Sequence, residues 1–163
     1  MKHIAFIGLG SNLANPAEQV LQAMLAIAQL PEIHVLARSS LYRSAPVGYL
    51  DQPDFINAVV KIETTLAPLA LLQILLALEQ VNGRTREFQN APRTLDLDVL
   101  LYDELQHHEH GLTVPHPQMH MRAFVLQPLM EIEPNSVIPG IGAAEQAMQL
   151  CADQQLEKLS NVT

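Results

Sequence analysis

The chain has 163 residues, of which 48% are apolar, so it is long enough for one domain over residues 1–163 with a sizeable core. Seventeen acidic residues against nine basic ones give a net charge of −8, which excludes nucleic acid and anionic membranes as general partners. Any anionic substrate must therefore be met locally, by arginine side chains or metal ions. The single Cys151 excludes an internal disulfide, and no apolar run approaches the length of a membrane span, so we expect a cytoplasmic protein.

The first part of the chain alternates short strands with two helices. Hydrophobic periodicity predicts strands at 3–9, 33–43, 55–63 and 95–102, and helices at 16–30 and 68–82. Asn15, Pro16 and Glu18 are typical of a capped helix start, and Gly83 is typical of a helix end. The predicted turn over Gly10–Asn12 matches no phosphate-binding motif, and we interpret it as mainly structural.

The second part predicts a hairpin with its return strand at 112–114 and three histidines within 107–110 near its tip. These histidines could bind a transition metal, although a solvated loop is the simpler interpretation. A helix is expected from His120 to a point before Pro134, followed by a short strand-like piece, a helix near 144–151 and a fraying tail. The element order predicts an α+β fold with a ferredoxin-like βαββαβ core, an antiparallel sheet with two helices packed on one face, plus a C-terminal hairpin and helical extension.

The strand over 95–102 carries two aspartates on one face. Its apolar positions alternate at Leu95, Leu97, Val99 and Leu101. Side chains two apart on a strand point the same way, so Asp96 and Asp98 stand about 6–7 Å apart, within reach of one metal site. Neighbouring ionised carboxylates repel unless a cation lies between them, and Mg²⁺ prefers oxygen ligands of this kind. The alternative is a half-buried edge strand with a solvated acidic face.

Two further groups favour a site for a flat, phosphorylated ligand. Phe55 and Asn57 share one face of their strand, and a ring beside an amide suits a planar polar heterocycle, although ordinary sheet residues explain the same pattern. The loop before the aspartate strand holds Arg84, Arg86 and Arg93, guanidinium groups that are typical of a polyphosphate clamp. The sheet face left open by the helices would carry both the amide and the carboxylates.

Residues 92–98 (PRTLDLD) resemble the signature of 6-hydroxymethyl-7,8-dihydropterin pyrophosphokinase, an enzyme family of folate biosynthesis. Supporting motifs follow in order at 10–13 (GSNL), 42–44 (YRS), 52–58 (QPDFINA), 83–84 (GR) and 112–117 (LTVPHP). The resemblance implies transfer of pyrophosphate from ATP to the hydroxymethyl group of the dihydropterin, with release of AMP. It also implies two Mg²⁺ ions, a monomer, and a functional link to dihydropteroate synthase.

The resemblance also implies roles for individual residues. Metal binding is expected of Asp96 and Asp98. The catalytic residues are expected to be Arg84, Arg93, Asp96 and Asp98. ATP contacts are expected from Glu79, Arg84, Arg86, Arg93, Val99, Thr113, His116 and Arg122. Pterin contacts are expected from Ser44, Ala45, Val47, Phe55, Asn57 and Phe124, with loops at 47–51 and 84–91 closing over the substrates.

The chain departs from the usual family pattern on the nucleotide side. It has no Trp, whereas well-known relatives carry one in the arginine loop, which is also a residue shorter here. Gln89 stands where a charged residue is usual, Gly111 replaces an arginine, and Pro117 replaces a tyrosine. Two alternatives stay open: a non-catalytic paralogue that binds pterin or nucleotide, and a metal-dependent nucleotidyltransferase, which would attach AMP and release pyrophosphate.

Overall fold

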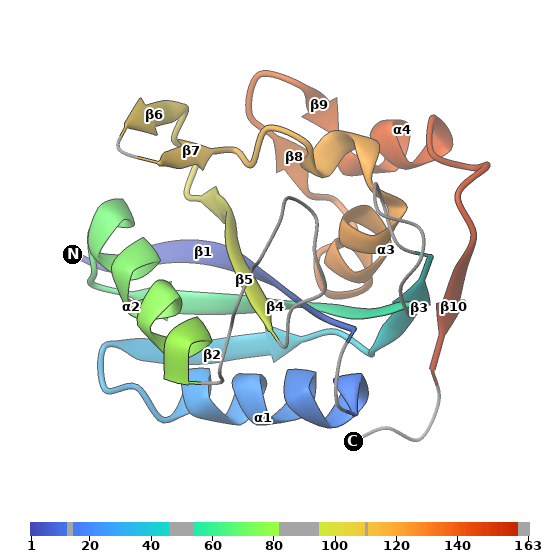
Figure 1. Ribbon diagram of the computed structural model, residues 1–163. Coiled ribbons are helices and arrows are strands. Elements are labelled where there is room, and N and C mark those ends of the chain that lie inside the picture. Colours follow the sequence, from blue (N-terminus) through green and yellow to red (C-terminus); the bar gives the residue numbers. More distant parts are fainter. Residues whose placement is uncertain (13–14, 46–53, 82–94, 110, 160–163) are drawn as a thin grey trace.

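The fold is taken from a computed structural model, and the structure describes residues 1–12, 15–45, 54–81, 95–109 and 111–159 (Figure 1). Its elements are, in order, β1 (His3–Ser11), α1 (Pro16–Ala28), β2 (Ile33–Arg38), β3 (Tyr42–Ser44), β4 (Phe55–Thr64), α2 (Pro68–Val81), β5 (Asp96–Tyr102), β6 (His107–Glu109), β7 (Leu112–Val114), the 3₁₀ turn η1 (Met119–Met121), α3 (Ala123–Ile132), β8 (Val137–Ile138), β9 (Gly142–Ala143), α4 (Ala144–Gln149) and β10 (Leu156–Lys158). Within these ranges, no helix combines the length and apolar character needed to cross a membrane.

An antiparallel sheet of six strands forms the centre of the molecule. Its strands follow the order β10-β3-β4-β1-β5, and β2 also pairs with β4. The central strand β1 pairs along its whole length with β4 on one side, and from Ala5 to Gly10 with β5 on the other. β5 stands last in this order, so it forms an edge of the sheet. The hairpins β6–β7 and β8–β9 are separate from the main sheet.

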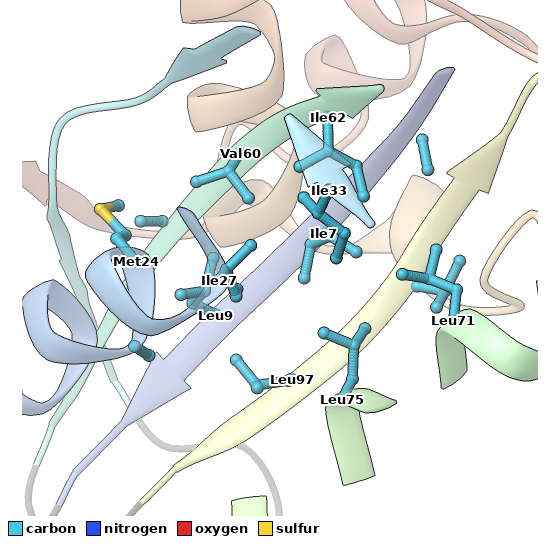
Figure 2. Packing of buried hydrophobic residues seen from close by; sticks show 14 of the residues in the cluster. Ile7, Leu9, Met24, Ile27, Ile33, Val60, Ile62, Leu71, Leu75 and Leu97 are labelled. Carbon is cyan, nitrogen blue, oxygen red and sulfur yellow. The ribbon is translucent and has the colours of Figure 1, made fainter. Parts of the chain in front are cut away.

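One face of the sheet packs against α1 and α2. Figure 2 shows Ile7 and Leu9 of β1 near Leu97 of β5, with Ile27 of α1 and Leu75 of α2 packed onto them. All five side chains are buried. Full burial of such a side chain stabilises the fold by about 1.5–3 kcal/mol. This face therefore forms the main core, and the inward residues predicted for β4 belong to it.

The opposite face is partly covered, which differs from the expected open face. A second cluster packs Phe6, Val59 and Leu100 of the sheet against Leu126 and Leu129 of α3, and α4 joins the same cluster. Helices therefore lie on both sides of the sheet (Figure 1). The apolar side chains on this second face explain why α3 packs there.

The single strand predicted over 33–43 is two strands in the structure, β2 and β3, which pair with β4 one after the other. Ser39 lies at the break. Its N–H donates to the Val59 carbonyl and its hydroxyl accepts from the Val59 N–H, each at 2.9 Å. A serine side chain that takes over a backbone bond in this way lets the chain leave the ladder.

One local prediction near the N-terminus is wrong, and another is confirmed only in part. α1 begins at Pro16 with Asn15 as its N-cap residue, as predicted, but Asn15 has a left-handed backbone (φ 60°) and makes no side-chain capping bond. β1 continues to Ser11, so Gly10 belongs to the strand and not to a turn. At the other end, the predicted fraying tail contains β10, which pairs with β3. The predicted helix at 144–151 and the return strand at 112–114 are confirmed.

The aspartate strand β5 has a bulge that breaks its predicted alternation. Ile7 pairs with Val99 but Phe6 pairs with Leu101, so Leu100 is an extra residue on the β5 side. As a result, Leu101 turns to the α3 cluster together with Leu100, against the prediction that it shares the face of Val99. The bulge follows the two aspartates and leaves their shared face unchanged.

Candidate active site

Two glycines of β1, which carry no side chain, lie between β4, with the Asn57 amide, and β5, with the Asp96 and Asp98 carboxylates. Gly10 pairs with Asn57 on one side and with Asp96 on the other. Directly paired residues of antiparallel strands share a face, and neighbouring strands lie about 4.8 Å apart, so the amide and this carboxylate stand about 10 Å apart. In the next row on this face, Gly8 lies between Val59 and Asp98.

Because Gly10 has no side chain, the surface of the sheet between Asn57 and Asp96 consists of backbone alone. A Cβ atom there would lie 3.2 Å from Asn57 Oδ1, closer than ordinary packing allows. Sequence reasoning missed this role, because Gly10 was assigned to a structural turn. The available signal was glycine inside a strand, which often marks a close approach by a ligand or another backbone.

The Asn57 amide is held in one orientation. Its Nδ2 donates to the hydroxyl of Ser44 on β3 at 2.7 Å, and both residues are buried. The amide oxygen therefore faces the space above Gly10, where it can accept a hydrogen bond. Phe55 lies two residues earlier on the same strand face and is half-buried. Ala45, the residue after Ser44, is exposed.

Asp96 and Asp98 share the face opposite the main core, and both are half-buried. In the part of the chain that the structure describes, no group of three or more His, Cys, Asp or Glu side chains could hold a metal ion. The site thus offers two carboxylates, and this oxygen-only pair suits a hard cation whose other ligands come from substrate phosphates. The histidines of β6 do not join it: His107 pairs with Glu109, and His108 contacts Thr113.

His116 and Arg122 lie on the segment that links β7 to α3, and His116 is hydrogen-bonded to the aspartate strand. The His116 N–H donates to the Leu100 carbonyl at 2.9 Å. Its Nδ1 accepts the N–H of Gln118 at 3.2 Å, so the neutral ring carries its proton on Nε2. Burial lowers the pKa of His116, and the Arg122 guanidinium lowers it further, while the Asp96 carboxylate acts in the opposite direction. The imidazole is therefore neutral at pH 7 and lies close to both charged groups.

Arg122 is also oriented by its neighbours. Its guanidinium donates to Gln118 Oε1 and lies 5.5 Å from the centre of the Phe124 ring. Such a cation–aromatic contact is attractive and holds the two side chains together. Phe124, at the start of α3, is half-buried.

Three of the residues expected to contact ATP make contacts within the chain. Glu79 is 1% exposed, and its Oε2 accepts the Leu97 N–H at 2.6 Å. The Val99 side chain lies in the main core, so only its backbone is available to a ligand. The Thr113 hydroxyl contacts His108 at 2.5 Å. The expected residues Val47, Arg84, Arg86 and Arg93 lie outside the described residues.

Comparison with known proteins places this geometry in a family. The model of the family 7,8-dihydro-6-hydroxymethylpterin-pyrophosphokinase (HPPK) matches residues 6–134. The chain belongs to this family. A Haemophilus influenzae protein named 2-amino-4-hydroxy-6-hydroxymethyldihydropteridine pyrophosphokinase is 46% identical over 156 residues, which cover 96% of this chain and 98% of that protein. A Pseudomonas aeruginosa protein of the same name is 44% identical, over 94% of this chain and 95% of its own.

Solved structures agree on the fold. The chain is similar to wild-type HPPK-DHPS of Plasmodium falciparum, whose crystal structure contains pterin and p-hydroxybenzoate, with a TM-score of 0.72 and 14% sequence identity. The match covers 91% of this chain and 42% of that longer chain. The HPPK family therefore shares this mixed α/β architecture with its antiparallel sheet, at sequence identities where only the fold is comparable.

Proposed function

We propose that the chain carries out its family's reaction on the face of the sheet that holds Asn57, Gly10 and Asp96. It transfers the pyrophosphoryl group of ATP to the hydroxymethyl group of 6-hydroxymethyl-7,8-dihydropterin, a reaction of folate biosynthesis. The hydroxyl oxygen forms a bond to the β-phosphorus and releases its proton to water, the bond from that phosphorus to the oxygen of AMP breaks, and AMP leaves. The observation that carries this assignment is the row in which a fixed amide and a carboxylate flank a bare glycine backbone.

The pterin binds at the Asn57 end of this row. The Asn57 oxygen accepts a hydrogen bond from the N–H groups on the edge of the pterin, because Ser44 already occupies the Nδ2 donor. The rings of Phe55 and Phe124 lie on either side of the flat heterocycle, and the backbone near Ala45 and Val47 completes the polar contacts. Gly10 lets the heterocycle lie against β1 without displacing the amide.

The carboxylates of Asp96 and Asp98 are the groups that would hold Mg²⁺, with two ions expected. Bound Mg²⁺ neutralises charge on the triphosphate and favours attack at the β-phosphoryl group. The carboxyl oxygens suit this ion, because two half-buried carboxylates share one strand face and Gly8, which pairs with Asp98, leaves room there for phosphate oxygens. By holding such ions, the two carboxylates would fix where the phosphates lie relative to the pterin hydroxyl.

The nucleotide is bound from the β5 edge and the segment before α3. Neutral His116 offers its Nε2–H, and Arg122 offers a guanidinium, to phosphate oxygens near Asp96. Arg84, Arg86 and Arg93 add positive charge from the stretch of sequence that precedes β5. A chain with a net charge of −8 needs such a local concentration of cations to bind ATP.

The same proposal includes two broader assignments. The core is ferredoxin-like, supported by the path β1-α1-β2-β4-α2-β5 and by the adjacency of β2, β4, β1 and β5 in the sheet. A functional link to dihydropteroate synthase is supported by the HPPK-DHPS chains among the similar structures.

Product analysis tests the proposal. The chain is mixed with ATP, Mg²⁺ and 6-hydroxymethyl-7,8-dihydropterin, and the products are separated by ion-exchange chromatography. We expect AMP and the pterin diphosphate in equal amounts. Free pyrophosphate with an adenylylated pterin would assign the chain to the nucleotidyltransferases, and pterin binding without AMP would make it a non-catalytic paralogue.

Substitution of either carboxylate supplies the matching control. Asp96→Ala or Asp98→Ala is expected to lower turnover by about 10³-fold or more, because phosphoryl transfer depends on electrostatic stabilisation. Circular dichroism should stay unchanged. Glu104→Ala removes one exposed carboxylate just after β5 and should leave turnover unaltered. Normal turnover in either aspartate variant would remove the metal role.

A further inference from the structure

One buried acidic side chain behind the aspartate strand has no role in the site described above. Glu79, near the end of α2, is 1% exposed, and its Oε2 accepts the Leu97 N–H at 2.6 Å. Leu97 is the residue between Asp96 and Asp98, and its own side chain points to the opposite face, into the main core. The contact therefore reaches the backbone of the two aspartates from behind.

The helix places this carboxylate where its pattern calls for an apolar residue. Leu71, Leu75 and Glu79 are the buried residues of α2, spaced four apart, so they form one stripe on the helix. A buried carboxylate is costly unless it accepts hydrogen bonds, and a leucine would continue the stripe. The contact with Leu97 N–H is one that compensates for this burial.

The position of β5 explains what the contact does. β5 is an edge strand, and the N–H groups on the outer side of an edge strand have no neighbouring strand to pair with. Two of its outer backbone groups are bound by other elements: Glu79 accepts from the Leu97 N–H, and the His116 N–H donates to the Leu100 carbonyl. α2 thus takes the place of a missing strand beside the two aspartates.

We propose that Glu79 is a positioning residue, whose bond to the Leu97 N–H fixes the Asp96–Leu97 peptide and so sets the direction of the carboxylates on either side of Leu97. The proposal replaces the direct ATP contact expected from the family resemblance, and it rests on the proposed role of Asp96 and Asp98 in binding metal and ATP. Rotation of the peptides next to Leu97 moves both carboxylates at once, so the single hydrogen bond from Leu97 to Glu79 controls the direction of both.

Two variants of Glu79 test the role of its hydrogen bond with the Leu97 N–H. Glu79→Leu continues the apolar stripe and removes the acceptor, whereas Glu79→Gln keeps an amide oxygen that can accept the same bond. Amide hydrogen exchange at Leu97, measured by NMR, shows whether the Leu97 N–H is still hydrogen-bonded. Mn²⁺ binding in the presence of ATP, measured by electron paramagnetic resonance, shows whether Asp96 and Asp98 still bind a metal ion. In Glu79→Leu we expect Leu97 exchange to rise about tenfold or more and Mn²⁺ affinity to fall about tenfold. Glu79→Gln should restore most of both.

Leu75→Ala serves as the matched control, since it removes packing from the same stripe without touching the backbone of β5 by a hydrogen bond. It should raise exchange across α2 and β5 without a selective effect at Leu97, and Mn²⁺ affinity should change less than twofold. Turnover separates the roles further: Glu79→Leu should lower kcat more than it raises KM for the pterin.

Three results would overturn the proposal. One is unchanged Leu97 exchange in Glu79→Leu; another is a Leu75→Ala variant that matches Glu79→Leu in Mn²⁺ affinity. The third is a rise in KM for ATP alone, with Leu97 protection intact, which would restore the direct ATP contact. Amide exchange and Mn²⁺ binding are both measured without turnover. A wild-type chain that forms no AMP but shows a protected Leu97 N–H and the expected effects of the Glu79 variants would therefore contradict the proposed function and still support the positioning role of Glu79.

Discussion

Gly10 is the residue on which the geometry of the site depends most directly. It separates Asn57 from Asp96, and an added Cβ would lie 3.2 Å from Asn57 Oδ1. The amide cannot simply turn away, because Ser44 holds its other end at 2.7 Å. A methyl group at this position therefore displaces the acceptor or the ligand, and it does so without altering any charge.

Gly10→Ala is expected to weaken pterin binding about tenfold, or about 1.4 kcal/mol, and to change ATP binding less than twofold. Isothermal titration calorimetry with the pterin and with a non-hydrolysable ATP analogue measures both. Gly8→Ala is the matched control, since its Cβ would meet the Leu100 side chain at 3.3 Å and not Asn57. Equal losses of pterin affinity in both variants would contradict the role of Gly10.

These residues also mark the limit of prediction from sequence at this scale. That Asp96 and Asp98 share one strand face was predictable because the pattern is local: two carboxylates with period two in an apolar strand. Gly10 was not, because its role depends on Asn57 and Asp96, which lie across two neighbouring strands. Glu79 was expected to contact ATP, and only its burial and its bond to Leu97 point to another role.

At the scale of elements, α3 is held to the sheet by a cluster of polar contacts around Glu131. Its carboxylate accepts from the hydroxyls of Tyr42 and Ser40, both at 2.7 Å, and from the Ser40 N–H. Lys158 of β10 stands 3.9 Å away. Burial alone would raise the pKa of Glu131, but the hydrogen bonds from Tyr42 and Ser40, with the charge of Lys158, outweigh it and lower the pKa. Burial, followed by Glu131 itself, raises the pKa of Tyr42.

Glu131→Gln is expected to lower the free energy of unfolding by about 1 kcal/mol at pH 7, since partial exposure weakens ionic hydrogen bonds. The folded-state pKa of Glu131 lies below its ordinary value of 4.5, so the contribution is fully present above pH 4.5 and is lost as pH falls through the lower folded value. Urea unfolding at pH 7 and at a series of pH values below 4.5 should therefore show a deficit that is largest at pH 7 and shrinks as the pH falls. Glu145→Gln, an exposed change on α4, should show none. An equal deficit at every pH would indicate lost packing.

Element boundaries show which signals the sequence carries. The clean alternation of β4 predicted its faces correctly, and Pro16 marked the start of α1. The break at Ser39 was not predictable, because it depends on a bond to Val59 twenty residues away. The bulge at Leu100 was hidden for the same reason: Leu97, Val99 and Leu101 alternate in sequence, and only pairing with β1 shows the extra residue.

At the scale of the whole molecule, the C-terminal segment adds the last strand of the sheet at the end where we propose that the pterin binds. β10 pairs with β3 in a register that sets Leu156 against Ser44, and the Leu159 N–H donates to the Leu41 carbonyl at 2.8 Å. Sequence reasoning expected a fraying tail, since three residues of mixed polarity carry no strand signal of their own. The segment is a strand only because the outer edge of β3 is available to it.

Removal of residues 156–163 leaves β3 as an edge strand and removes the backbone partner of Ser44. We expect thermal unfolding to shift down by several degrees, since a loss of about 1 kcal/mol moves the midpoint by about 2–8 °C in domains of this size range. Pterin affinity should fall more than ATP affinity, because Ser44 orients Asn57 while His116 and Arg122 are anchored elsewhere. Differential scanning calorimetry and titration with each ligand measure these effects.

Glu157→Gln separates backbone pairing from surface charge in the same segment. It breaks the ion pair between Glu157 Oε1 and an Arg43 guanidinium nitrogen, which lie 2.7 Å apart on largely exposed side chains. The backbone pairing of β10 with β3 is kept. Exposed ion pairs contribute about 0–1 kcal/mol, so this variant should bind pterin like the wild type and unfold at nearly the same temperature. If it reproduces the loss of pterin affinity seen on truncation, the ion pair and not the strand holds β3. If truncation lowers the affinity for both ligands equally, β10 supports general stability and does not act on the pterin end through Ser44.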